Sequence, residues 1–236
     1  MISVCMTTYN GQEYVEEQIN SILCQLGQND ELIISDDGSS DLTLILVKDI
    51  IANDARVKLL SGPQEGLIKN FENALLASKG EYIFLSDQDD VWHPDKVNNY
   101  LASFEKGADL VISDAYIINE SGEKTADSFY SINGSKKGLL KNLIKNSYLG
   151  CCLAFRRDLM VEVLPFPEKI PMHDWWIGLV AEYRNLNVIF LKNKLLYYRR
   201  HHNNVSATGE VSPFGIIQKI VFRFNVLCSL VKLGIK

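Results

Sequence analysis

The feature that most constrains the fold of this chain is an alternation of short apolar runs and helical patterns across its first half. The apolar runs lie at residues 2–7, 31–35, 57–60 and 82–85. Apolar residues at helical spacing lie between them, at residues 14–26, 42–51 and 67–77. This alternation predicts a parallel sheet with crossover helices, and 236 residues suffice for one α/β domain with a sizeable core.

Polar clusters directly follow three of the predicted strands. The clusters are Thr7-Thr8-Tyr9-Asn10, Asp36-Asp37-Gly38-Ser39-Ser40-Asp41 and Asp87-Gln88-Asp89-Asp90. The carboxyl ends of parallel strands share one edge of a sheet, and open α/β sheets bind ligands beyond that edge. We therefore predict that the three clusters belong to one site.

The third cluster gives the clearest chemical signal. Three carboxylates within four positions beside an apolar strand repel one another, so a compensating cation is expected. Carboxylate oxygens suit Mg²⁺ or Mn²⁺, which keep positions open for substrate phosphates. The alternative is a solvated turn in which Asp90 caps the following helix.

The alternation continues through a predicted helix over residues 94–104 and a predicted strand over 110–113, and it stops after a turn at 119–123. The chain beyond this turn has a different, mixed α+β pattern, with a predicted helix over residues 157–164, a helix that opens at Met172, and strands over 188–191 and 195–198. The segment 149–155 is apolar with small residues, which suits close backbone approach.

The composition is that of a soluble globular protein and argues against nucleic acid as the main partner. The chain is 47% hydrophobic and 22% charged, with a formal net charge of −5. The five cysteines lack Cys-x-x-Cys spacing, and the N-terminus lacks the features of a secretory signal. We therefore expect reduced cysteines and a cytoplasmic location.

The tail of the chain carries only basic charges. From Pro213 onward the charged residues are Lys219, Arg223, Lys232 and Lys236, and apolar residues recur at helical spacing around them. The charges are too frequent for a transmembrane span. Two interpretations stay open: a helix that packs on the domain or on a second copy in a homodimer, and an amphipathic helix that rests on the anionic inner face of the cell membrane.

Five motifs, taken in order, resemble those of family 2 inverting glycosyltransferases with the GT-A fold. They are the clusters at 7–10, 36–41 and 87–89, His173-Asp174-Trp175-Trp176, and Tyr198-Arg199-Arg200-His201. Residues 85–92 and 199–204 most resemble motifs of bacterial rhamnosyltransferases of surface polysaccharide synthesis. The resemblance implies a Rossmann-like, mostly parallel sheet in one catalytic domain over residues 1–205, with a nucleotide-sugar half (1–118) and an acceptor half (119–205). A basic amphipathic helix over residues 206–236 follows.

The resemblance also implies which residues bind the nucleotide. Thr8 and Tyr9 match the segment that holds the base, and Asp36 matches a carboxylate that accepts a hydrogen bond from the imide N–H of uracil or thymine. Lys69 matches a basic residue near the diphosphate. Asp87 is expected to contact the ribose or to support the site.

A metal and a general base are implied as well. Asp89 and His201 match ligands of a Mn²⁺ or Mg²⁺ ion that neutralises the departing diphosphate. Position 202 is also histidine, so either His201 or His202 is the candidate ligand. Asp174 matches the base that deprotonates the acceptor hydroxyl, and the alternative is a helix cap beside two core tryptophans.

The expected function is transfer of rhamnose from dTDP-L-rhamnose to a cell-surface polysaccharide or a lipid-linked glycan. A UDP-hexose or UDP-hexosamine donor would use the same motifs. A non-catalytic sugar-nucleotide-binding or scaffold subunit is the alternative from another class, and the presence of Asp174 argues against it. A phosphohydrolase is disfavoured because Thr7-Thr8 follows the first strand in place of a nucleophilic aspartate.

Overall fold

The computed structural model describes residues 1–202, 204 and 214–234. The described strands are β1 (Ile2–Thr8), β2 (Glu31–Asp36), β3 (Val57–Ser61), β4 (Tyr82–Ser86), β5 (Val91–Trp92), β6 (Leu110–Ile118), β7 (Lys124–Ala126), β8 (Leu153–Arg156) and β9 (Val188–Arg199). The described helices are α1 (Val15–Leu23), α2 (Thr43–Ile51), α3 (Leu67–Ala77), α4 (Lys96–Glu105), α5 (Phe129–Asn133), α6 (Leu139–Ile144), α7 (Asp158–Val163), α8 (His173–Tyr183) and α9 (Ile216–Gly234), with a 3₁₀ turn at Gly150–Cys152.

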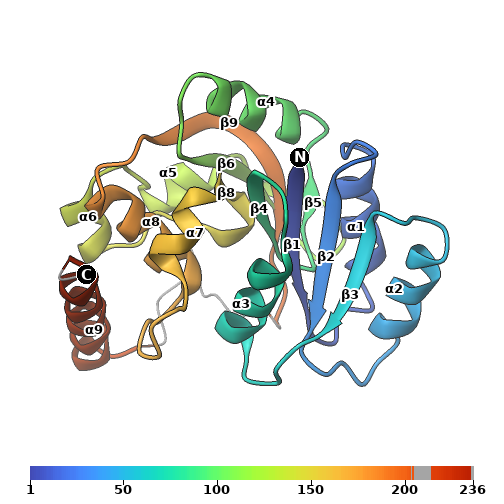
Figure 1. Cartoon of the computed structure of the whole chain (residues 1–236), viewed down its shortest axis with the longest axis horizontal. Helices are drawn as coiled ribbons and strands as arrows, with labels where there is room; N and C mark the ends of the chain where they lie inside the picture. Colours follow the sequence, from blue (N-terminus) through green and yellow to red (C-terminus); the bar gives the residue numbers. More distant parts are fainter. Residues whose placement is uncertain (203, 205–213, 235–236) are drawn as a thin grey trace.

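The described strands form one curled sheet in the middle of the molecule (Figure 1). Its order is β3-β2-β1-β4-β8-β6-β9-β5, and β7 pairs with β6 outside this path. The strands β3, β2, β1 and β4 are parallel to one another and are joined by α1, α2 and α3. The predicted parallel sheet with crossover helices is therefore confirmed. Every residue of the central strand β1 is buried, which explains its continuous apolar run.

The second half adds strands of mixed direction to this sheet. Strand β8 lies between β4 and β6 and is antiparallel to both. Strand β9 is parallel to β6 and antiparallel to the short β5, which directly follows the acidic cluster. The mixed α+β character of this half is confirmed, and β5 fixes one end of the acidic loop to β9.

The predicted bounds of two strands, β6 and β9, differ from the structure. The strands predicted over residues 188–191 and 195–198 are one strand, β9, and the strand predicted over 110–113 continues to Ile118. Both differences have one cause, because the pairing of β6 with β9 shifts register on either side of Asp114. Such an irregularity interrupts the apolar alternation while the strand itself continues.

The last described element, α9, lies at the edge of the molecule beside α8 (Figure 1). It covers Ile216–Gly234 of the helix predicted over residues 206–236, and residues 206–213 and 235–236 lie outside the described part. Val226 and Leu230 are buried against the domain, whereas a second apolar stripe on the same helix is exposed. Among the described helices, none is long and apolar enough to cross a membrane.

Candidate functional site

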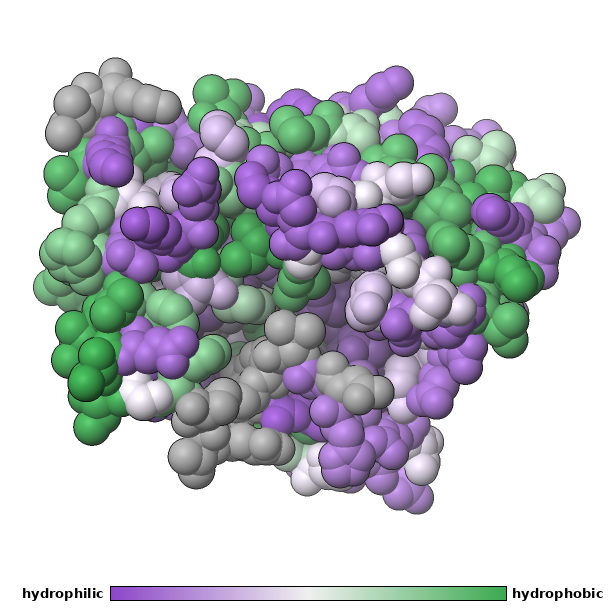
Figure 2. Space-filling view, turned by 90° about the horizontal axis from the view of Figure 1, so that it is seen from below, coloured by the Kyte–Doolittle hydropathy of each residue, from purple (hydrophilic) through white to green (hydrophobic). Residues whose placement is uncertain are grey.

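A cavity of about 1010 Å³ opens where the carboxyl ends of the central strands meet the second half of the chain. It underlies the hollow in the face of the molecule shown in Figure 2. The first half contributes Thr8, Tyr9, Asp37, Asp87 and Asp89, among others, to its wall, and the second half contributes Leu149, Gly150, Met172, His173, Asp174, Tyr198 and His201. The polar clusters that the sequence places at three strand ends therefore do share one cavity.

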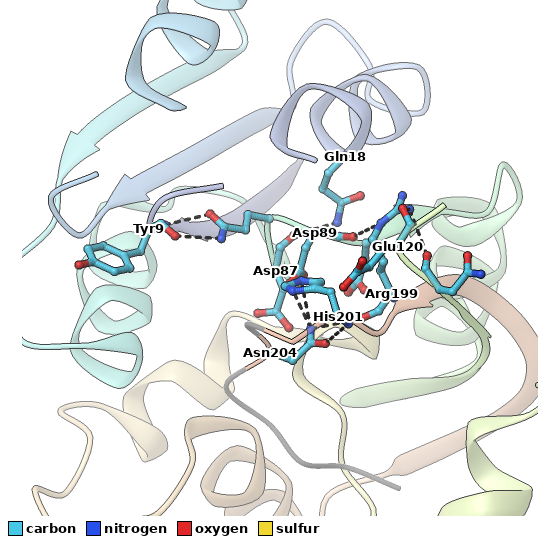
Figure 3. Close-up of polar contacts among 11 residues, drawn as sticks. Tyr9, Gln18, Asp87, Asp89, Glu120, Arg199, His201 and Asn204 are labelled. Atoms are coloured by element: carbon cyan, nitrogen blue, oxygen red, sulfur yellow. Dashed lines mark hydrogen bonds and ion pairs between the residues drawn. The ribbon is translucent and has the colours of Figure 1, made fainter. Parts of the chain in front are cut away.

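Asp89 and His201 meet at this cavity. The Nε2 atom of His201 lies 2.8 Å from Oδ2 of Asp89, and Asn204 donates a hydrogen bond from Nδ2 to the same oxygen at 3.3 Å (Figure 3). Asn204 also accepts a hydrogen bond at Oδ1 from the His201 backbone N–H at 2.6 Å. His202 is exposed and is not among the described residues that line the cavity. Of the two candidate histidines, His201 is the one that reaches Asp89.

Asp87 lies in a crowded electrostatic environment. Burial, together with the nearby charges of Asp89 and Asp174, raises the pKa of its carboxyl group to about 7. The charges of Asp89 and Asp174 thus repel that of Asp87, and a cation bound beside Asp87 would relieve this repulsion. The carboxylate oxygens of this group suit Mn²⁺ or Mg²⁺.

A second group of possible metal ligands is more deeply buried than the Asp89–His201 pair. One ligand atom each of Asp87, Asp90 and Cys151 lies within 4.8 Å of the other two. Asp90 and Cys151 are fully buried, and burial raises the pKa of both well above the ordinary values. Neutral thiol and carboxyl groups are poor ligands, so the Asp89–His201 pair at the cavity is the better candidate. Asp90 is no helix cap, since α4 starts after Asp95.

Arg199, at the end of β9, holds the acidic loop in place. Its backbone N–H donates to Oδ1 of Asp90 at 2.9 Å, and its Nε donates to the carbonyl oxygen of Asp89 at 2.8 Å. The guanidinium group also donates to the carbonyl oxygen of Glu120 at 3.1 Å and pairs with Glu17 at 2.6 Å (Figure 3). Sequence reasoning quoted Arg199 as part of a motif without giving it this role.

Asp36 and Asp37 take different positions. Both Asp36 oxygens already accept hydrogen bonds, from the Thr8 and Ser39 hydroxyls and from backbone N–H groups of Gly38 and Ser39. Asp36 is 5% exposed and is not among the described residues of the cavity wall. Asp37 does line the cavity, where each of its oxygens accepts one backbone N–H, from Gln64 and Gly66. The carboxylate available to a ligand is therefore Asp37, whereas the sequence interpretation chose Asp36.

Tyr9 and Lys69 have contrasting surroundings. The side-chain amide of Gln88 forms two hydrogen bonds with the backbone of Tyr9. It accepts from the Tyr9 N–H at 2.9 Å and donates to the Tyr9 carbonyl oxygen at 3.0 Å (Figure 3). The Tyr9 ring is 59% exposed at the cavity and is free to stack on a ligand. Lys69 instead pairs with Glu72 at 3.1 Å and is not among the described cavity residues, so the structure does not bring it to the site.

Asp174 stands in the first turn of α8, in the wall of the cavity. Burial raises the pKa of its carboxyl group to about 7, against the opposing effect of the backbone N–H groups of Trp175 and Gly150. Trp175 and Trp176 are core residues whose indole N–H groups donate to carbonyl oxygens of Asn142 and Val163. Asp174 can therefore accept a proton near neutral pH.

Comparison with known proteins identifies the family of this chain. The model of "Glycosyl transferase family 2" matches residues 3–164. A curated relative, the dTDP-rhamnosyl transferase RfbG of Shigella flexneri, is 24% identical over 94% of this chain and 82% of its own length.

Two solved structures share the fold. The S. aureus TarS fragment 1–349 in complex with UDP-GlcNAc has a TM-score of 0.72 at 19% identity, over 98% of this chain and 72% of that one. The mannosyltransferase PcManGT of Pyrobaculum calidifontis, in complex with GDP-Man and Mn²⁺, has a TM-score of 0.66 at 18% identity, over 86% of this chain and 58% of that one. The fold is thus the GT-A fold of glycosyltransferases, and since the family model matches more than half of the sequence, the chain belongs to glycosyltransferase family 2.

Proposed function

We propose that this chain is an inverting glycosyltransferase that moves a sugar from a nucleoside-diphosphate donor to a hydroxyl group of an acceptor glycan. The observation that supports this best is that Asp174 and the Asp89–His201 pair line one cavity, although they come from different parts of the chain. Inverting transfer needs a base for the acceptor hydroxyl and a means to stabilise the departing diphosphate. The cavity offers candidates for both.

The nucleotide would bind at the ends of β1 and β2. The Tyr9 ring is available to stack on the base, and Asp37 has lone pairs left to accept the imide N–H of uracil or thymine. Thr8 and Asp87 line the same cavity, and their side chains are the candidates for hydrogen bonds to the ribose hydroxyl groups. We assign base selection to Asp37 in place of Asp36, because the oxygens of Asp36 are occupied by protein donors.

Asp89 and His201 would hold a Mn²⁺ or Mg²⁺ ion, with Asp87 beside them. When bound, the ion neutralises negative charge on the departing nucleoside diphosphate. The complex of PcManGT with Mn²⁺ supports this choice of metal. Asn204 and Arg199 would keep the two ligands in place through the hydrogen bonds described above.

Asp174 would take the proton from the acceptor hydroxyl as that oxygen attacks the anomeric carbon. The bond from the anomeric carbon to the diphosphate oxygen breaks as the new glycosidic bond forms, so the configuration inverts. A carboxyl group with a pKa of about 7 suits this task, because it is partly ionised at neutral pH and still basic enough to accept the proton.

The proposed donor is dTDP-L-rhamnose, supported by the similarity to RfbG across most of both chains. The runner-up is a UDP-hexose or UDP-hexosamine, supported by the TarS complex with UDP-GlcNAc. An aspartate that accepts an imide N–H suits thymine and uracil equally, so base selection does not separate these donors.

Calorimetric titration tests this function. We would titrate dTDP, UDP, GDP and their sugar conjugates into wild type and Asp89→Ala, each with and without Mn²⁺. Metal-dependent binding of dTDP or UDP species that Asp89→Ala weakens supports the proposal and ranks the donors. No nucleotide binding under any condition contradicts it. A donor that binds tightly but is never transferred to any glycan acceptor would favour a non-catalytic subunit.

The acceptor is proposed to be a cell-surface polysaccharide or a lipid-linked glycan. Helix α9 supports a lipid carrier, because its exposed stripe is apolar and its charged residues are all basic. The stripe consists of Ile216, Ile217, Ile220, Val221, Phe224, Leu227 and Val231. It forms part of the hydrophobic left edge in Figure 2. A helix of this kind can rest on an anionic membrane surface, here the cytoplasmic face of the cell membrane, and a homodimer contact is the alternative use of the stripe.

A further inference from the structure

The imidazole ring of His173 is a buried polar group that has no hydrogen-bond partner in the described part of the chain. The side chain is 1% exposed, and neither Nδ1 nor Nε2 has a hydrogen-bond partner among the described residues. Nearly all buried polar groups are hydrogen-bonded in folded proteins, so each exception needs an explanation. His173 lies in the wall of the cavity, which suggests that its missing partner is a ligand.

The surroundings of the ring fix its charge and its orientation. It stacks on Phe71 with ring centroids 4.0 Å apart, and Phe166 lies 6.4 Å away. Burial lowers the pKa of the imidazole to about 3, so the ring is neutral at any working pH. A neutral imidazole offers one N–H donor and one acceptor nitrogen, and a hydroxyl group likewise both donates and accepts.

The backbone at Gly150 closes over the same ring. A Cβ atom at position 150 would lie 3.0 Å from Nε2 of His173 and 3.6 Å from Cβ of Asp174. Phe71 on one side and Gly150 on the other thus restrict the imidazole. A side chain that is already restrained can hydrogen-bond a ligand hydroxyl group with little loss of conformational entropy.

The position of His173 indicates which part of the substrate it meets. It directly precedes Asp174, the proposed base at the reacting carbon, so its backbone lies near the reacting sugars. The ring that it stacks on belongs to α3, which packs against β1 and β2 in the nucleotide half. The contact with Phe71 thus links the imidazole to the half of the chain that is proposed to bind the donor.

We propose that His173 is a specificity-determining residue that hydrogen-bonds a hydroxyl group of the transferred sugar. The proposal rests on the proposed function. Leu149 and Met172, its neighbours in the cavity wall, are apolar, and so is Leu67 at the start of α3. These apolar neighbours suit a deoxyhexose better than a fully hydroxylated hexose.

The test compares each nucleoside diphosphate with its own sugar conjugate. We would titrate dTDP, dTDP-L-rhamnose, UDP and UDP-glucose, with Mn²⁺ and without acceptor, into wild type, His173→Phe and His173→Gln. His173→Phe keeps a flat ring against Phe71 but cannot hydrogen-bond, whereas His173→Gln keeps a donor and an acceptor. His93→Gln is the matched control, because His93 is not among the described cavity residues.

We expect His173→Phe to bind the free nucleoside diphosphate within twofold of wild type and to bind its sugar conjugate about tenfold more weakly. His173→Gln should recover part of the loss, and His93→Gln should bind both like wild type. If His173→Phe binds conjugate and free diphosphate in the wild-type ratio, whether both are tight or both are weak, the proposal is overturned while the proposed function stands. If wild type itself binds no nucleotide, both fail together.

An acceptor-side role would give a different result. In that case, His173→Phe would leave the affinity for the sugar conjugate unchanged and would raise only the KM for the acceptor in a transfer assay. That outcome also contradicts the proposal, because it assigns the hydrogen bond to the other sugar.

Discussion

The Nε2 atom of His201 lies 2.8 Å from Oδ2 of Asp89, although 112 positions separate the two residues in the chain. The contact joins the loop after β4 to the segment after β9, and both residues line the cavity. It therefore gives a direct way to test the proposed metal site, because a neighbouring histidine provides a matched control.

His201→Ala is expected to lower metal-dependent nucleotide affinity and transfer rate by about 100-fold or more, since even residues that only support metal ligands are worth 10- to 100-fold. His202→Ala should change both by less than twofold, because His202 is exposed and is not among the described cavity residues. Calorimetry with Mn²⁺ and a transfer assay measure the two effects. Equal losses in the two variants would contradict the assignment.

Transfer should depend on pH through Asp174. Burial raises its pKa to about 7, and only the ionised carboxylate can accept a proton, so kcat/KM should fall about tenfold per pH unit below 7 and level off above it. Asp174→Asn should lower kcat by about 10²- to 10⁴-fold.

Nucleotide affinity must be measured over the same pH range, because the pKa of Asp87 is also raised to about 7 and its protonation would affect binding. Undiminished transfer by Asp174→Asn would show that another group is the base. A pH profile of kcat/KM that follows nucleotide affinity alone would assign the pH dependence to the donor site.

Arg199→Met is expected to lower the free energy of unfolding by about 3 kcal/mol, because it removes a buried cation and leaves carbonyl oxygens of the acidic loop without a donor. Glu17→Gln removes only the partly exposed ion pair of the same guanidinium group and should cost less than about 1 kcal/mol. Urea unfolding followed by circular dichroism measures both. Similar costs for the two variants would mean that the ion pair, and not the loop contacts, gives Arg199 its effect.

Paired substitutions in α9 test membrane contact. Ile220→Glu with Phe224→Glu should lower the fraction of protein that sediments with vesicles containing anionic lipid by about tenfold, because both side chains are exposed on the apolar stripe. Adding salt should weaken binding of wild type, since the attraction of the basic residues is screened. If sedimentation is unchanged and wild type is a dimer that the substitutions dissociate, the stripe is a subunit contact instead.

Sequence reasoning predicted the parallel half of the fold well, because β1, β2 and β4 are apolar runs of ordinary length separated by clear helical patterns. It missed β8, whose short run Leu153–Arg156 carries no alternation, and β5, which has only two residues and so gives no pattern. It also divided β9 in two, because a register shift opposite Asp114 interrupts the pattern that a strand prediction follows.

Within the candidate site, the segments that the sequence singled out do line one cavity, but the sequence could not predict which of their side chains face it. Asp36 and Asp37 are adjacent and chemically identical, and only packing shows that Asp36 turns to Thr8 and Ser39 while Asp37 lines the cavity. His173 and Asn204 lie in motifs that the sequence singled out, but they were given no role, for a related reason. A histidine or an asparagine has no distinctive spacing, and its significance comes from partners that are distant in sequence or absent.

The direct contact between the loop after β4 and the segment after β9 has a consequence for how the protein is made. A ribosome-bound chain that has emerged only as far as β8 already contains Asp87, Asp89 and Asp90, but it lacks Arg199 and His201. The acidic loop therefore lacks its contacts with Arg199 and His201 until β9 and the residues after it have been synthesised and have packed against it. The proposed metal-binding pair Asp89–His201 can therefore form only after nearly the whole domain has been synthesised.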